Sequence, residues 1–118
     1  MSDQYDRLDA ELFAALGHPT RCAIVEFLAQ RTARPTEIAK CIENTFGLWH
    51  HLGKLVDVGL VTARRLDHKH TIYAADPTAL MQLAKQLAML VEQAQKAIEA
   101  PLEEVATEEL ETVFAIES

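Results

Sequence analysis

The sequence predicts a small, mainly helical α+β domain that contains one β-hairpin. Three observations predict it. Apolar residues repeat with a helical period up to Gly59, two short strand-like runs follow, and the helical period returns after Pro77. A chain of 118 residues is long enough for one domain with a single core. We therefore expect one domain over residues 1–100 and an acidic tail or short helix over residues 101–118.

Three helices are expected at the start of the chain. The first covers residues 6–16 and is stopped by Gly17, and the second begins at Pro19, since proline favours a first helical turn. The third covers residues 36–42, with Thr36 as its cap. The residues expected to face the core from these helices are Leu8, Leu12, Phe13, Leu16, Ile24, Val25, Phe27, Leu28, Ile38 and Cys41.

A fourth helix is expected after Asn44 or Thr45, either of which is a favourable cap. Its apolar residues have the spacing of one helical face, and Gly59 ends it. The residues of that face are Leu48, Leu52, Leu55 and Val56.

The next segment reads as two strands, residues 60–65 and 70–75, joined by a polar turn over residues 66–69. A long helix opens at Asp76–Pro77 and is interrupted by Pro101. It is apolar over so wide a face that one side of a small domain cannot cover it, so a partner chain is expected. The apolar residues of that face are Leu80, Met81, Leu83, Ala84, Leu87, Ala88, Leu90, Val91 and Ala94.

The order of helix, helix, short helix, helix, hairpin and long helix is that of a winged helix-turn-helix. In such a unit the helix before the hairpin enters the major groove of DNA. A symmetric dimer places two of these helices about 34 Å apart, which requires an inverted-repeat operator.

The charge distribution is compatible with DNA although the net charge is −7. Residues 13–75 contain eight basic and five acidic residues, a net charge of +3, and all five histidines. The remaining residues carry −10. A mildly basic centre between acidic ends fits a protein that meets phosphate through one face.

A cytoplasmic location without membrane contact is expected. No run approaches the ~20 apolar residues of a transmembrane helix, and residues 1–6 are acidic rather than signal-like. The two cysteines suit a reducing compartment.

Five short segments follow one another in the order and spacing of a known family. They are residues 12–21, residues 36–39, residues 51–52 with Leu55, residues 59–61 and residues 64–65. Together they resemble the ArsR/SmtB family of repressors over about residues 8–95. The resemblance implies a homodimer built on the first and last helices, binding to double-stranded operator DNA, and release by an inducer that the sequence does not identify.

The resemblance also implies that the family's metal sites are absent. Asp76, Thr78, Met89 and Glu92 stand where zinc- or cobalt-sensing relatives have their ligands, and residues 33–35 lack the Cys-x-Cys of arsenic and cadmium sensors. No metal and no cofactor is therefore expected.

The fourth helix departs from the serine, glutamine, threonine and arginine that the family usually presents. We expect Thr45, Trp49 and His50 to touch base edges or methyl groups and Lys54 to touch phosphate. The alternative is that Phe46 and Trp49 fill a gap against the second helix. The candidate DNA-binding residues of this segment are Asn44, Thr45, Phe46, Gly47, Trp49, His50 and Lys54.

Five basic or histidine residues cluster in the hairpin. We expect them to contact phosphate or the minor groove, with a solvated basic turn as the alternative. They are Arg64, Arg65, His68, Lys69 and His70.

Cys22 and Cys41 are interpreted first as small buried residues. A redox interpretation requires their Cα atoms to lie within about 7 Å. A histidine metal site is disfavoured, because the adjacent His50 and His51 point about 100° apart on a helix.

The sequence therefore predicts a homodimeric repressor released by an inducer or a redox signal. The alternative is a winged-helix dimer that has lost DNA binding and serves as a protein-interaction module, which the acidic net charge and the unusual fourth helix favour. No phosphate-binding loop, nucleophile elbow or carboxylate pair indicates an enzyme.

Overall fold

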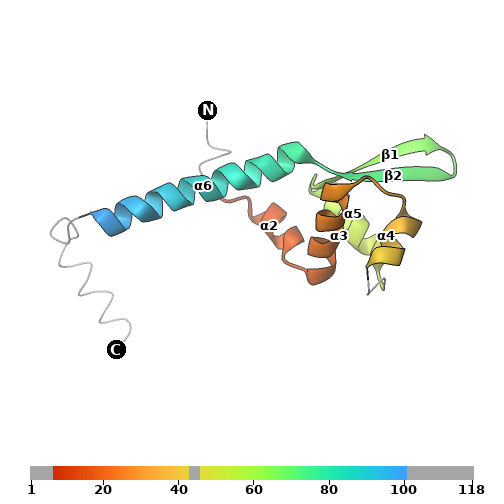
Figure 1. Ribbon diagram of the computed structural model, residues 1–118, viewed down its shortest axis with the longest axis horizontal. Helices are drawn as coiled ribbons and strands as arrows, with labels where there is room; N and C mark the ends of the chain where they lie inside the picture. The colour runs from red at the N-terminus through yellow and green to blue at the C-terminus, as the bar shows by residue number, and fades with distance from the viewer. Residues whose placement is uncertain (1–6, 43–45, 101–118) are drawn as a thin grey trace. The chain divides into compact units, whose positions relative to one another are not determined.

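The computed structural model describes residues 7–42 and 46–100. It confirms a mainly helical chain with one antiparallel hairpin (Figure 1). The elements are α2 (Ala10–Leu16), α3 (Pro19–Gln30), α4 (Pro35–Cys41), α5 (Leu48–Asp57), β1 (Val61–Asp67), β2 (His70–Ala75) and α6 (Pro77–Glu99).

The starts of α2 and α4 differ from the prediction, and a local hydrogen bond explains each. Helix α2 begins at Ala10 because the Asp9 carboxylate accepts from the backbone N–H of Leu12 at 3.2 Å. Helix α4 begins one residue before the expected cap Thr36, since Pro35 occupies its first turn and Arg34 is its cap. The Arg34 N–H donates to the Glu37 side chain at 2.9 Å.

Helix α5 is capped by Gly47 in a left-handed conformation, with φ of 72°. The expected caps Asn44 and Thr45 lie outside the described residues. A left-handed cap needs a residue without a Cβ, so glycine rather than a polar side chain starts this helix. At its other end, Gly59 has φ of 86° and turns the chain into β1.

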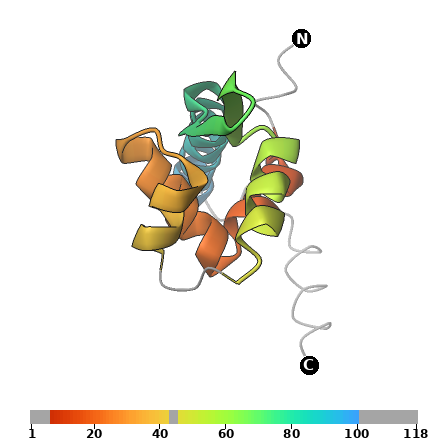
Figure 2. The same cartoon turned by 90° about the vertical axis from the view of Figure 1, so that its right-hand side faces the viewer.

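The core is formed by side chains from α2, α3, α4, α5, the root of the hairpin and Leu83 of α6. Figure 2 views the helices from the hairpin end. Helix α5 buries Leu48, Leu52 and Leu55 as predicted, whereas Val56 is exposed. The residues expected to face the core from the first three helices are buried or half-buried, except Leu8 and Cys41, which are exposed. The largest fully buried side chains are Ile24, Ile38, Leu52, Leu55, Leu60 and Val61.

Cys41 was expected to face the core and does not. It is the last residue of a seven-residue helix that buries Ile38 alone, so it lies at the rim and is exposed. Cys22 is half-buried in α3, and both thiols are free.

The hairpin is longer, and its turn shorter, than predicted. Strand β1 extends to Asp67, so the turn contains only His68 and Lys69, and the register shifts between Arg65 and Asp67. An isolated antiparallel bridge of two backbone hydrogen bonds joins β2 to the segment between α3 and α4. Ala33 N–H donates to the Tyr73 carbonyl at 3.1 Å, and Tyr73 N–H donates to the Ala33 carbonyl at 2.8 Å.

The described chain divides into two compact units with the boundary after Leu87, inside α6. In the first unit, α6 buries Leu83 and holds α2 by hydrogen bonds. Asp9 N–H donates to Gln86 Oε1 at 2.8 Å, and Gln82 Nε2 donates to Asp9 Oδ2 at 3.3 Å. No helix of the described residues has the length and apolar character to cross a membrane.

Candidate nucleic-acid interface

Helix α5 has one buried face and one exposed face, as a helix that reads DNA requires. Away from its three buried leucines, Trp49 is 68% exposed and His50 is exposed as well, and Phe46, two residues before the helix, is 89% exposed. A residue that fills a gap against α3 would be covered, so this exposure contradicts the packing alternative for the two aromatic side chains. They lie on the surface of the α5 segment.

Gly53 lies one turn beyond Trp49 on the same exposed face. A Cβ placed on Gly53 would meet nothing within 4 Å, so packing inside the chain does not require glycine there. Glycine inside a helix costs roughly 0.5–1 kcal/mol relative to alanine. A helical glycine that no internal contact explains suggests a surface made for close approach by another molecule.

Asp67 organises the tip of the hairpin formed by β1 and β2, which we call the wing. The sequence did not indicate this role. Asp67 Oδ1 accepts from the backbone N–H groups of Lys69 and His70, at 2.8 and 3.0 Å. The His70 ring donates to the same carboxylate at 3.0 Å. The bond from the His70 side chain, followed by the bond from the Lys69 backbone, lowers the pKa of Asp67. Arg65 donates to the His68 carbonyl at 3.0 Å, a further side-chain hydrogen bond at the tip.

A groove of about 330 Å³ joins the wing to α5. It brings together Trp49 from the helix and Lys69 and His70 from the wing, which the sequence had predicted as separate parts of one interface. Arg34 and Thr36, at the start of α4, also line this groove and were missed. Their proximity follows from the tertiary fold, and no local pattern signals it.

Arg64 lies on the opposite face of the hairpin from this groove. Alternate side chains of a strand point to opposite faces. Arg65 pairs with Thr71, which lines the groove, whereas Arg64 pairs with Ile72 and lines a separate hollow of about 440 Å³. The wing residues therefore do not form one patch, and Arg65 is the arginine on the side of Trp49.

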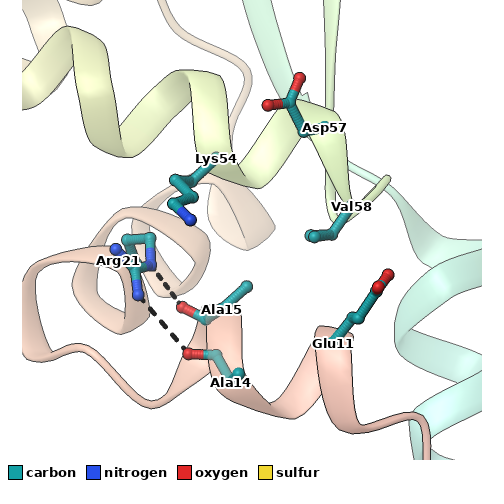
Figure 3. A pocket seen from close by; sticks show the side chains of 7 residues that line it. All are labelled: Glu11, Ala14, Ala15, Arg21, Lys54, Asp57 and Val58. Carbon is teal, nitrogen blue, oxygen red and sulfur yellow. Dashed lines mark hydrogen bonds between the residues drawn. The ribbon is translucent and has the colours of Figure 1, made fainter.

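Lys54 also points elsewhere, into a hollow of about 380 Å³ between α2, α3 and α5. Figure 3 shows Lys54 and Arg21 on one side of it and the carboxylates of Glu11 and Asp57 on another. Two basic and two acidic side chains leave this hollow without net charge. It is therefore a weaker site for phosphate than the groove beside Trp49.

Arg21 lines the same hollow and connects the start of α3 to the end of α2 by hydrogen bonds. Its guanidinium donates to the carbonyls of Ala15 at 2.7 Å and Ala14 at 3.5 Å. It also lies 3.3 Å from Nδ1 of His51, on α5. One arginine thus links the three helices, and the sequence indicated only that it belongs to the family-like segment.

Two histidines meet at this junction, with 4.4 Å between the ring centroids of His18 and His51. Because a guanidinium only donates, His51 Nδ1 must accept and its proton sits on Nε2. His18 Nδ1 likewise accepts from the Thr20 N–H at 3.1 Å and caps α3. Burial lowers the pKa of His51, and the nearby His18, Arg21 and His50 lower it further.

Among the described residues, no group of three or more His, Cys, Asp or Glu side chains could hold a metal ion. The ring centroids of His50 and His51 lie 5.8 Å apart, but no third ligand from the described part of the chain joins them.

Comparison with known proteins identifies the fold. No family model and no curated protein sequence matches the chain. Among solved structures, an ArsR-like transcriptional regulator from Rhodococcus sp. RHA1 has a TM-score of 0.69 at 22% identity, covering 83% of this chain and 92% of that one. The transcriptional repressor BigR from Xylella fastidiosa has 28% identity and a TM-score of 0.55, covering 69% and 83%.

A third structure, the homodimeric winged helix-turn-helix DNA-binding domain Mb0332 from Mycobacterium bovis, has 26% identity and a TM-score of 0.55, covering 82% of this chain and 83% of that one. The chain has the fold of the ArsR-family transcriptional regulators. In this ArsR-type fold α4 and α5 form the helix-turn-helix, and β1 and β2 form the wing.

Proposed function

We propose that this ArsR-type chain is a homodimeric repressor that binds operator DNA through α5 and the wing. The observation that carries the proposal is the groove in which Trp49 of α5 lies beside Lys69 and His70 of the wing. A helix that reads bases and a hairpin that neutralises phosphate then meet DNA as one surface. Such a protein works in the cytoplasm and needs no catalytic group.

Exposed apolar residues on α6 support the dimer. Leu87 is 46% exposed, and Leu90 and Val91 are also exposed. The structurally similar Mb0332 domain is described as homodimeric. A symmetric pair of α5 helices requires an operator with two inverted half-sites about one DNA turn apart.

The signal that releases the operator belongs to the proposal as well. An inducer is one route, and oxidation is another, for which the exposed thiol of Cys41 on α4 is the accessible group. Because α4 precedes the reading helix, a chemical change there acts on the helix-turn-helix itself.

The test is a titration of duplex DNA at several salt concentrations. A repressor that contacts phosphate binds generic duplex at low salt, and its affinity falls linearly on a logarithmic scale, with a slope of about −0.9 per phosphate neutralised. Fluorescence anisotropy of a labelled duplex measures this. Absence of binding at low salt would contradict the proposal and would favour the alternative of a protein-interaction module.

A further inference from the structure

We propose that α5 selects its operator by apolar contact with the methyl groups of thymine, and that Trp49 is the main reading residue. Gly53 then lets the edge of the base approach the helix. This inference rests on the proposed function, since it names the chemistry by which the same surface distinguishes one DNA sequence from another.

The exposed face of α5 offers apolar area where a reading helix usually offers paired hydrogen-bonding groups. Phe46 and Trp49 are largely exposed, and Val56, seven residues after Trp49, is 36% exposed. Arg and Lys make paired hydrogen bonds to guanine, and Asn and Gln make them to adenine. Residues 46–57 contain no Arg, Asn or Gln, and their one Lys, Lys54, lines the hollow beside α2 rather than the groove beside Trp49. Thymine is the base that presents a methyl group in the major groove, and an apolar side chain recognises it.

Gly53 shapes this face for close approach. It lies four residues after Trp49 and three before Val56, so all three fall on one stripe of the helix. Because no atom lies within 4 Å of its missing Cβ, the position forms an open gap between the two apolar side chains. A methyl group entering that gap touches Trp49 on one side and the helix backbone below.

The charges beside this stripe favour DNA as its occupant. The groove lined by Trp49 also carries Arg34, Lys69 and His70, and it has no carboxylate among its lining residues. A DNA strand supplies apolar methyl groups next to phosphates, which matches an apolar stripe with a basic rim.

The first experiment compares thymine with deoxyuridine, which lacks only the methyl group. Duplexes that the full-length protein prefers are selected from a random pool, and each thymine of the half-sites is then replaced by deoxyuridine. The expected loss of affinity is about fourfold for each contacted methyl, since burying one such group is worth about 0.8 kcal/mol. Equal affinity for both duplexes, or selected half-sites without thymine, overturns the inference.

Three variants test the assigned residues. Trp49→Ala should abolish the preference for thymine over deoxyuridine. Arg65→Ala is the control, because removing a charge that meets phosphate should weaken binding to both duplexes equally and leave their ratio unchanged. Gly53→Ala should raise the Tm of the free protein, since alanine is the better helix former, and yet weaken binding to the selected duplex.

The results separate this inference from the proposed function. If the wild-type protein binds no duplex at low salt, the proposed function fails and the inference fails with it. If it binds duplex but Trp49→Ala keeps the thymine preference, or Gly53→Ala leaves the affinity unchanged, only the thymine inference is wrong.

Discussion

His51 connects α5 to the rest of the fold through a neutral imidazole. Its Nδ1 faces the guanidinium of Arg21 at 3.3 Å, and its ring packs on His18. A proton on Nδ1 would replace an acceptor with a donor that points at a positive charge. The geometry and the lowered pKa of His51 therefore agree that the folded state favours the neutral ring.

This arrangement predicts that acid destabilises the fold. The pKa of His51 in the folded state lies below its ordinary value of 6.5. At pH values between these two pKa values, the unfolded chain therefore binds more protons than the folded chain. The stability contributed by neutral His51 is fully present above about pH 6.5 and is lost as the pH falls through the folded pKa. Denaturant unfolding at a series of pH values measures the loss.

The matched variant is His51→Asn, whose amide oxygen accepts from Arg21 but does not titrate. It should flatten the dependence of the unfolding free energy on pH below about 6.5. His70→Ala, at the wing tip, should leave the contribution of His51 in place. An acid dependence that is unchanged in His51→Asn would assign the effect to other groups.

Cys41 allows the oxidation route to be tested at one residue. If oxidation releases the operator, peroxide should dissociate the complex of the wild-type protein with DNA, and Cys41→Ser should abolish that release in a gel-shift assay. Cys22→Ser distinguishes the chemistry, since it blocks release only if the two thiols form a disulfide. A Cys41→Ser protein that still responds to peroxide excludes the thiol as the sensor.

At the level of elements, the hairpin divides its charges between its two faces. Arg65 and Lys69 belong to the side of the groove beside Trp49, and Arg64 belongs to the other side. Only the first side adjoins the reading helix. We therefore expect the wing to neutralise fewer phosphates than its number of basic residues implies.

The double variant Arg65→Ala with Lys69→Ala should weaken operator binding and reduce the magnitude of the salt slope by about 2, one unit for each phosphate that is no longer neutralised. Arg64→Ala is the control, because it removes a positive charge from the opposite face and should leave the slope nearly unchanged. A double variant with the wild-type slope would remove the wing from the interface.

The order of elements was predictable because the periodicity of apolar residues reports on burial directly. The alternation after Gly59 and the leucine spacing in α5 each needed only local information. The starts of α4 and α5 were not predictable in this way. Arg34 caps α4 through a backbone N–H that any residue supplies, and the left-handed cap at Gly47 replaced the polar caps that the sequence favoured.

The candidate site was predicted in its composition but not in its geometry. The sequence indicated Trp49, Lys69 and His70, yet their meeting in one groove depends on how the hairpin folds back beside α5. The opposite orientation of Arg64 depends on strand register. The contact between His18 and His51 joins residues 33 positions apart, which no local pattern reports.

At the scale of the whole molecule, α6 carries more apolar surface than its own chain covers. Within the described residues its buried side chains are Leu83 and Gln86, whereas Leu87, Leu90 and Val91 are exposed. Exposed leucines at this spacing favour association with the same surface of a second copy.

Leu87→Glu should therefore produce monomers, which light scattering coupled to gel filtration detects. Gln95→Glu adds the same charge at an exposed polar position of the same helix, and this control should remain dimeric. A dimer that persists in Leu87→Glu would place the interface elsewhere.

The short bridge between Ala33 and Tyr73 couples the hairpin to the helix-turn-helix. Two backbone hydrogen bonds join the root of the wing to the segment that leads into α4. We therefore expect the hairpin and the helix-turn-helix to move together. A signal that shifts either part should withdraw both from the double helix at once, so release should be abrupt rather than stepwise.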